Sequence, residues 1–364
     1  MIFLHLGITS VACIVFAFPV MPAPQSPVPF GLSPSKHLTQ YIHEAWPTEK
    51  TRLEGAIRTM VQTREGYLWI GAQEGLFRFD GENITPFNTR STPQFVSNVV
   101  SALFEDREGN LWIGTSDGLL KYHDRSFTRY TTEDGLSSNI VLSLFEDRRG
   151  VLWIGTANAG VNVLSGGIFS PWGNKTPLEK GTVWAICEDD RGSLYFGTAG
   201  GGVFRFDETG LKNFNRRQGL AHDLVRSLAR GSNGSVWVGT QGGLSKLQGS
   251  SIISYTARNG LSNEIVMSVL EDRYGTVWCG TGGGGVNRLR DGSFSSFTSK
   301  NGLTNDDILS FCEDREGNLW LGTSDGLNRL RDGDFTTYTA LEGMTNDVVW
   351  CVLEDRRGTI WLGT

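Results

Sequence analysis

The chain is built from copies of one stretch, Glu105-Asp106-Arg107-Glu108-Gly109-Asn110-Leu111-Trp112-Ile113-Gly114-Thr115. Most copies combine acidic residues, a turn that ends in glycine, and the pattern apolar-Trp-apolar-Gly-Thr. The Trp-x-Gly core recurs at Trp69/Gly71, Trp112/Gly114, Trp153/Gly155, Trp237/Gly239, Trp278/Gly280, Trp320/Gly322 and Trp361/Gly363, and one further copy has Tyr195 before Gly197. The glycines of successive copies are 43, 41, 42, 42, 41, 42 and 41 residues apart. A repeat of about 40–45 residues is typical of β-propellers.

The composition agrees with an all-β repeat protein. The chain has 364 residues, which is long for one domain, but a repeat array can exceed the usual limit. Its 47 glycines and 11 prolines indicate frequent turns with short segments between them, and this favours strands. The net charge is −6 and Lys and Arg form no run, so we expect no nucleic-acid partner.

Residues 139–171 show how one repeat should fold. Four short β-rich runs are predicted, at residues 141–146, 152–156, 161–164 and 168–171. The first two are joined by Asp147-Arg148-Arg149-Gly150, where the aspartate starts a turn and the glycine can adopt a positive φ. Four short antiparallel strands in about 42 residues make one propeller blade.

The repeated residues are best interpreted as structural. A tryptophan in the second strand of every blade, such as Trp153, should pack against the neighbouring blade and bury roughly 150–250 Å². Gly155, two positions later, indicates that another segment approaches closely there. A catalytic carboxylate is needed once, whereas a turn is needed in every blade. We therefore expect turn-forming roles for Asp106, Asp147, Asp272, Asp314 and Asp355.

No cofactor, metal or catalytic set is expected. Cys187, Cys279 and Cys312 stand where other repeats carry apolar residues, so we interpret them as small core residues and not as a disulfide or metal set. The five histidines are scattered without metal-ligand spacing. The glycine cluster at residues 282–285 lacks the following Lys-Ser/Thr and helix of a phosphate-binding loop.

The N-terminus predicts export. Residues 1–23 are apolar and end in Met21-Pro22-Ala23, as in a signal peptide with a small-residue cleavage site. Lys and Arg are missing near the start, and the apolar stretch approaches membrane-spanning length, so an uncleaved anchor is the alternative. Residues 24–37 form a Pro-rich spacer that should be extended. We expect a periplasmic or other extracytoplasmic location.

The repeat resembles a known family. Leu111-Trp112-Ile113-Gly114-Thr115, Gly118-Leu119, residues 127–130 and Gly135-Leu136 are similar to the two-component-regulator propeller repeat, over about residues 38–364. In that family the repeats build seven-bladed propellers, commonly two in tandem, that form the periplasmic sensor part of hybrid histidine kinases. The resemblance implies that this chain senses a glycan-derived oligosaccharide or a similar polar small molecule.

The chain departs from the family pattern at its end. Residues 360–364 form a second strand with no third strand after it, and no internal transmembrane run, kinase nucleotide motif or response-regulator pattern is present. The resemblance implies that the complete protein has downstream sensor and histidine kinase domains that are missing here. It could be membrane-anchored and form a homodimer. This chain alone is expected not to be an enzyme.

The number of blades depends on how the ring closes. Leu38-Thr39-Gln40-Tyr41 is similar to the fourth-strand stretch Phe127-Thr128-Arg129-Tyr130, which predicts a spare outer strand before the first full repeat. We predict that residues 38–42 pair outside residues 326–330 and complete a seven-bladed ring over residues 38–333, because a blade latched by the other terminus leaves no open edge. Residues 334–364 would then begin a second propeller. The alternative is an eight-bladed ring.

One position of the first strand differs in kind between repeats and marks the candidate site. It reads Arg58, Ser101, Leu142, Trp184, Arg226, Met267, Leu309 and Trp350, whereas the next residue stays small. A position that can hold Arg or Trp in some copies is not part of the repeating core. We predict that Arg58, Trp184, Arg226 and Trp350 bind the ligand, since Trp offers a flat face to a sugar ring and Arg a planar fork to hydroxyls or a carboxylate. The alternative is that they fill a solvent-facing channel.

Polar residues just before this strand have two explanations. They are Asn98, Asn139, Asp223, Glu264, Asp306 and Asp347, with Asn263, Asn305 and Asn346 beside some of them. These side chains could bind a polyol, but we favour hydrogen bonds to the backbone at the strand entry.

Two other functions compete with ligand sensing. A propeller enzyme, such as a lyase or glycan hydrolase, would need an acid/base set from one or two atypical repeats, and these repeats gain none. An exported protein-interaction scaffold would resemble WD-repeat propellers, but their Gly-His and Trp-Asp dipeptides are absent.

Overall fold

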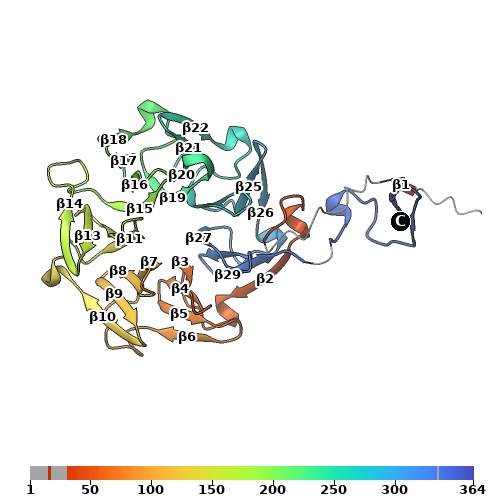
Figure 1. Cartoon of the computed structure of the whole chain (residues 1–364). Coiled ribbons are helices and arrows are strands. Elements are labelled where there is room, and N and C mark those ends of the chain that lie inside the picture. Colours follow the sequence, from red (N-terminus) through yellow and green to blue (C-terminus); the bar gives the residue numbers. More distant parts are fainter. Residues whose placement is uncertain (1–14, 18–30, 334–335) are drawn as a thin grey trace, which may run out of the picture.

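Seven four-stranded antiparallel sheets surround a central channel in the computed structural model, which describes residues 15–17, 31–333 and 336–364 (Figure 1). Each sheet is one blade, and its first strand lies nearest the channel. The ring confirms the predicted all-β, seven-bladed fold.

Six blades consist of consecutive strands. Blade 1 contains β3 (Ile57–Gln62), β4 (Leu68–Ala72), β5 (Gly75–Phe79) and β6 (Ile84–Phe87). Blade 2 contains β7 (Val100–Glu105), β8 (Leu111–Thr115), β9 (Gly118–His123) and β10 (Ser126–Tyr130). Blade 3 contains β11 (Val141–Glu146), β12 (Leu152–Thr156), β13 (Val161–Ser165) and β14 (Ile168–Trp172). Blade 4 contains β15 (Val183–Glu188), β16 (Leu194–Thr198), β17 (Val203–Asp207) and β18 (Gly210–Phe214). Blade 5 contains β19 (Val225–Arg230), β20 (Ser235–Thr240), β21 (Gly243–Gln248) and β22 (Ser251–Tyr255). Blade 6 contains β23 (Val266–Glu271), β24 (Val277–Thr281), β25 (Val286–Arg290) and β26 (Ser293–Phe297).

Blade 7 joins the two ends of the propeller. It contains β27 (Ile308–Glu313), β28 (Leu319–Thr323), β29 (Gly326–Arg331) and, as its outer strand, β2 (Ile42–Pro47). A separate sheet is formed by β1 (Val15–Ala17), β31 (Ile360–Gly363) and β30 (Cys351–Glu354), away from the ring (Figure 1). Short 3-10 helices complete the description: η1 (Leu38–Gln40), η2 (Thr48–Lys50), η3 (Thr132–Asp134), η4 (Arg216–Gln218), η5 (Ser232–Gly234), η6 (Ala257–Asn259), η7 (Ser299–Asn301) and η8 (Ala340–Glu342).

An N-terminal strand closes the ring as predicted, and we call this outer strand of blade 7, β2, the latch. The prediction placed the latch too early in the sequence, at residues 38–42. Residues 38–40 form η1, and β2 follows them. In β2, Trp46 lies opposite Leu327, just as Tyr130 lies opposite Leu119 in blade 2. Trp46, and not Tyr41, is therefore the fourth-strand aromatic residue of blade 7. Its ring packs 5.4 Å from that of Trp320.

Tyr41 has a different role from the one predicted. It does not lie beside residues 328–330; its ring packs 6.4 Å from that of Trp278 in blade 6. Its hydroxyl donates to the Ser33 carbonyl oxygen at 2.7 Å and accepts from Arg288 Nη1 at 3.1 Å. Burial raises the pKa of Tyr41 to about 12. The segment before the latch is thus fixed to blade 6.

The eight-bladed alternative is wrong. The outer edge of β29 is occupied by β2, and β30 pairs with β31 outside the ring. Trp350, which an eighth blade would turn toward the channel, is 81% exposed.

In each blade of the ring, the glycine two residues after the motif Trp or Tyr lies where the first strand of the next blade presses against the sheet. A Cβ on Gly155 would come within 2.7 Å of the Val183 carbonyl oxygen, and one on Gly322 within 2.5 Å of Ile57 Cγ2. Val183 begins the first strand of blade 4, and Ile57 begins that of blade 1. The close approach that Gly155 predicted is confirmed, and it recurs around the whole ring.

A buried aspartate ties the first turn of most blades to the motif tryptophan. Asp147 Oδ1 accepts the backbone N–H groups of Arg149 and Val151 at 2.9 and 3.0 Å, and Oδ2 accepts the indole N–H of Trp153 at 3.0 Å. Burial alone would raise the pKa of Asp147, but these hydrogen bonds hold it below its ordinary value. The same indole bond joins Trp112 to Asp106, Trp278 to Asp272, Trp320 to Asp314 and Trp361 to Asp355. The turn-forming role of these aspartates is confirmed.

The three cysteines that were interpreted as core residues belong to the apolar core. Cys187 and Cys279 are buried in clusters that join neighbouring blades, and the partly buried Cys312 packs beside another such cluster.

Hydrogen bonds between polar residues join neighbouring blades at the C-terminal ends of the first strands, and we call these contacts the polar seams. Arg107 of blade 2 donates its backbone N–H to Glu146 Oε2 of blade 3 at 2.9 Å, and its guanidinium donates to the Asp147 carbonyl oxygen at 2.8 Å. The pattern continues from blade 3 to blade 4, from 6 to 7 and from 1 to 2. Between blades 7 and 1, Gln62 Oε1 replaces the glutamate and accepts from the Arg315 backbone N–H at 2.8 Å.

The seam between blades 4 and 5 has the charges reversed. Blade 4 carries Asp190 where blades 1, 2, 3, 6 and 7 carry arginine. Blade 5 carries Arg230 where those blades carry glutamate or glutamine at the end of the first strand. The two side chains form an ion pair. The two departures from the repeat therefore compensate each other.

No helix among the described residues is long and apolar enough to cross a membrane. The predicted signal peptide or anchor at residues 1–23 lies outside the described part of the chain, apart from residues 15–17.

Replacing Trp153 by Ala should lower the free energy of unfolding by about 3–5 kcal/mol, because it removes a large buried ring and leaves the Asp147 carboxylate without the indole donor. Chemical denaturation of the purified chain measures this. Trp350→Ala, which removes an exposed ring, is the matched control. A Trp153→Ala protein as stable as that control would show that the ring is not part of the core.

The reversed seam can be tested by a double-mutant cycle. Asp190→Arg and Arg230→Glu should each destabilise the ring by up to about 1 kcal/mol, since each places like charges together at a partly exposed pair. The double variant restores the arginine–glutamate order of the other seams and should recover most of this loss. Additive losses in the double variant would show that the two residues are not coupled.

Candidate functional site

A β-bulge at the start of each first strand creates the lining of the channel. The pairing of first and second strands is irregular between Ile57 and Thr59, and at the same place in the other six blades. A bulge leaves one residue outside the ladder and redirects its side chain. The bulged residues are Arg58, Ser101, Leu142, Trp184, Arg226, Met267 and Leu309. These seven residues are the position that the sequence showed to vary.

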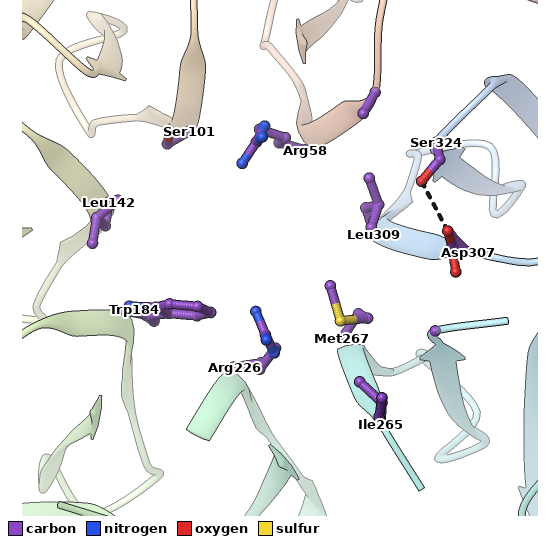
Figure 2. A pocket seen from close by; sticks show the side chains of 12 residues that line it. Arg58, Ser101, Leu142, Trp184, Arg226, Ile265, Met267, Asp307, Leu309 and Ser324 are labelled. Carbon is purple, nitrogen blue, oxygen red and sulfur yellow. Dashed lines mark hydrogen bonds between the residues drawn. The ribbon is translucent and has the colours of Figure 1, made fainter. Parts of the chain in front are cut away.

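All seven bulged residues line one pocket at the mouth of the channel, and we call it the channel pocket (Figure 2). Its volume is about 670 Å³, within the range of small-molecule sites. The residues on either side of each bulge keep their structural roles. Val183, for example, is fully buried against Gly155 of the preceding blade, while Trp184 faces the channel. The fold thus leaves one residue per blade free to vary.

The structure brings together three of the four predicted site residues. Arg58, Trp184 and Arg226 line the channel pocket and come from blades 1, 4 and 5. Trp350 does not, because it lies outside the ring, where its backbone N–H donates to the Gly363 carbonyl oxygen at 2.7 Å. Its position in the repeat matches the others, but its repeat is not a blade of this propeller.

Five lining residues were not predicted: Ala56, Ile265, Gly282, Asp307 and Ser324. Ala56, Ile265 and Asp307 immediately precede a first strand, and Gly282 and Ser324 lie in the loop between the second and third strands of their blades. The Ser324 backbone N–H donates to the Asp307 carbonyl oxygen at 3.2 Å, and Gly282 bonds Ile265 in the same way. The residue before the first strand is uncharged in the other six blades, so Asp307 could have been recognised by the same comparison of repeats.

Trp184 and Arg226 form a stacked pair in the pocket. The Arg226 guanidinium carbon lies 4.6 Å from the centre of the Trp184 ring, a cation–π distance. Burial lowers the pKa of Arg226, but a guanidinium stays protonated in proteins. Arg226 Nε and Trp184 Nε1 are buried without a hydrogen-bond partner in the described chain. The stack therefore holds a charged group partly out of water.

The pocket also has an apolar wall and one acidic group. Met267 and Leu309, which lie next to each other, form the wall, and Leu142 lies on the opposite side of the pocket (Figure 2). The acid is Asp307, whose Oδ2 accepts the Ser324 hydroxyl at 3.3 Å. Apolar surface with a few polar groups is the usual make-up of a ligand site.

The polar residues before the first strands serve the backbone, as we favoured. Asn139 Oδ1 accepts the Thr132 N–H at 2.9 Å, and Asp306 Oδ1 accepts the Ser299 N–H at 2.6 Å. The equivalent acceptors are Asn98, Asp223, Glu264 and Asp347, and Asn263, Asn305 and Asn346 accept from backbone two residues on. Their side chains are thus engaged in holding the loops between blades.

Among the described residues no three His, Cys, Asp or Glu side chains are grouped so that they could hold a metal ion. The channel pocket, as described, contains one carboxylate, Asp307, and no histidine.

Known proteins match both the repeats and the fold. The family description "two component regulator propeller" matches residues 94–117, 135–158, 177–200, 219–242, 260–283, 302–325 and 343–364. These matches cover the first two strands of blades 2 to 7 and the β30–β31 hairpin. No curated protein sequence matches the chain.

Several solved structures have the same fold. The extracellular domain assigned to the hybrid two-component system BT3049 of B. thetaiotaomicron is 24% identical with a TM-score of 0.73, covering 89% of this chain and 47% of that one. A streptogramin B lyase is 14% identical with a TM-score of 0.65, covering 80% of this chain and 98% of that one. At these identities the likeness shows the fold alone. This chain spans about half the length of the BT3049 domain.

The fold and the site together define a seven-bladed β-propeller with a ligand-sized pocket at the mouth of its channel. The repeat matches, spread from residue 94 to residue 364, give the family. The chain belongs to the two-component-regulator propeller repeat family, as the resemblance of its repeats implied.

Because the bulge separates channel residues from the core, Trp184→Ala should cost much less stability than Trp153→Ala. We expect a loss of about 1 kcal/mol or less, mainly from the lost stack with Arg226. Denaturation of both variants under one condition makes the comparison. Equal losses would show that Trp184 is part of the blade packing.

Proposed function

We propose that this chain is an extracytoplasmic ligand-sensing propeller of a two-component signalling protein. The channel pocket would bind a glycan-derived oligosaccharide or a similar polar small molecule. One observation carries the proposal: the residue that the bulge turns into the channel differs in chemical kind between otherwise similar blades. A lining selected only to fill space would not need Arg, Trp, Ser and Met at equivalent positions.

The family membership supports the signalling part of the proposal. Propellers of this family, by their description, belong to two-component regulators, and the BT3049 relative is described as an extracellular domain. The complete protein would carry a signal peptide or anchor at residues 1–23, a spacer at 24–37 and a downstream histidine kinase. A homodimeric receptor is part of the same proposal.

The last repeat supports a second propeller after the first. In the β30–β31 hairpin, Asp355 Oδ2 accepts the Trp361 indole N–H at 3.0 Å, as in the blades of the ring. Val352 and Leu353 of β30 are exposed, although the equivalent strands of the ring are covered on both sides. We propose that residues 334–364 begin this second propeller and that residues 38–333 form the first.

An enzymatic function is less well supported. The streptogramin B lyase shares the fold at 14% identity, which carries no argument about chemistry. A lyase or hydrolase would need a set of acid and base groups placed around its substrate, whereas the described lining of the channel pocket offers one carboxylate, which accepts a hydrogen bond from Ser324.

A screen of oligosaccharides by thermal shift and calorimetry tests the binding proposal. Trp184→Ala should weaken binding of any hit by about tenfold or more, because a large aromatic surface is lost from the lining of the pocket. Trp350→Ala is the matched control, since it removes the same residue type at the same repeat position outside the ring. Binding that depends on Trp350 and not on Trp184 would contradict the channel pocket as the site.

A further inference from the structure

The channel pocket contains two cations without a counter-ion. Arg58 and Arg226 extend toward the middle of the channel from different blades in Figure 2. Neither forms an ion pair with a described residue. Asp307, the only acidic residue among the described residues of the lining, immediately precedes the first strand of blade 7 and accepts a hydrogen bond from Ser324. The lining therefore carries a net positive charge.

The arginines at the other end of the first strands, in the polar seams, differ from those of the pocket because they have carboxylate partners. There the arginines of the seams are paired, for example Arg148 with Glu188 at 2.9 Å and Arg273 with Glu313 at 2.6 Å. The fold thus supplies carboxylates to arginines that hold blades together, and it supplies none to the two arginines of the pocket.

The positive pocket belongs to a negative protein. The chain as a whole has a net charge of −6, so it repels anions at long range. A local positive site in such a chain therefore selects an anionic ligand through direct contact with its arginines and not through long-range attraction. Arg226 adds to this effect because it is partly desolvated over Trp184 and has an unsatisfied Nε, and a partly desolvated cation gains most from an anion beside it.

The neighbouring surface fits a ring-shaped body. Trp184 lies on one side of Arg226, and the apolar wall of Met267 and Leu309 lies on the other (Figure 2). Arginine forks bind carboxylate and sulfate-like oxyanions through paired N–H donors. A small inorganic anion would leave the apolar wall uncovered, whereas a substituted sugar ring would contact both parts.

We infer that the ligand of the channel pocket is an acidic saccharide, whose carboxylate or sulfate group is held by Arg226 and Arg58 while its ring lies against the apolar wall. This inference rests on the proposed function and specifies the chemical class of the ligand. It makes Arg226 a determinant of specificity, and Trp184 both its stacking partner and part of the binding surface.

Matched sugar pairs test the inference. Galacturonate and glucuronate, as mono- and disaccharides, are compared by calorimetry with galactose and glucose of equal length, and galactose 6-sulfate distinguishes sulfate from carboxylate. The acidic member of at least one pair should bind at least about tenfold more tightly than its neutral partner, as expected for charge-assisted hydrogen bonds. Arg226→Gln and Arg58→Gln should reduce this preference, and Arg226→Lys should restore part of it.

Arg356→Gln is the control, because it removes the same charge in the β30–β31 turn, outside the ring. It should leave the preference unchanged. Equal or tighter binding of the neutral sugars, lost in Trp184→Ala, would overturn the acidic ligand and leave the sensing proposal standing. No binding of any neutral or acidic sugar would overturn both. Acidic-sugar binding that both arginine variants retain would also overturn the inference.

Discussion

The ring depends on the close contact between each Trp-x-Gly glycine and the first strand of the next blade. At Gly155 and Gly322 no side-chain carbon can be accommodated, because backbone or branched side-chain atoms of the next strand already occupy its place. The motif tryptophan lies beside this contact, fixed by an aspartate of its own turn in most blades. Because blade 7 makes the same contact with blade 1, one local rule, repeated seven times, produces a closed ring.

The bulge in each first strand lets one short segment have two roles. Buried residues such as Val183 pack against the preceding blade, and the bulged neighbour Trp184 is turned into the channel. A regular strand would alternate its side chains between the two faces of the blade, and both faces are covered by neighbouring blades. The irregular pairing therefore provides a position where substitution changes the pocket without changing the packing.

Much of this could be predicted from the sequence, because a repeat supplies its own comparison. In residues 139–171 all four strands begin where predicted, and the last two each extend one residue further. The variable position identified Arg58, Trp184 and Arg226 for the same reason. Trp350 was misplaced because a repeat fixes the position within a blade but not which ring the blade joins. The outer strand of blade 7 was placed too early because the short stretch ending in Tyr41 has the sequence pattern of a fourth strand. Pairing across 283 residues, as between Ala45 and Asn328, leaves no local signal in the sequence.

The reversed seam between blades 4 and 5 has a consequence for folding. Blades this similar could dock in the wrong order while the chain is partly folded, a recognised failure of repeat proteins. Asp190 would face a glutamate if blade 4 met most other partners, and Arg230 would face an arginine if blade 5 followed another blade. Only the native neighbours bring the two opposite charges together. One exchanged pair of charges thus disfavours the docking of blades 4 and 5 with other partners, in an array whose other polar seams are nearly alike.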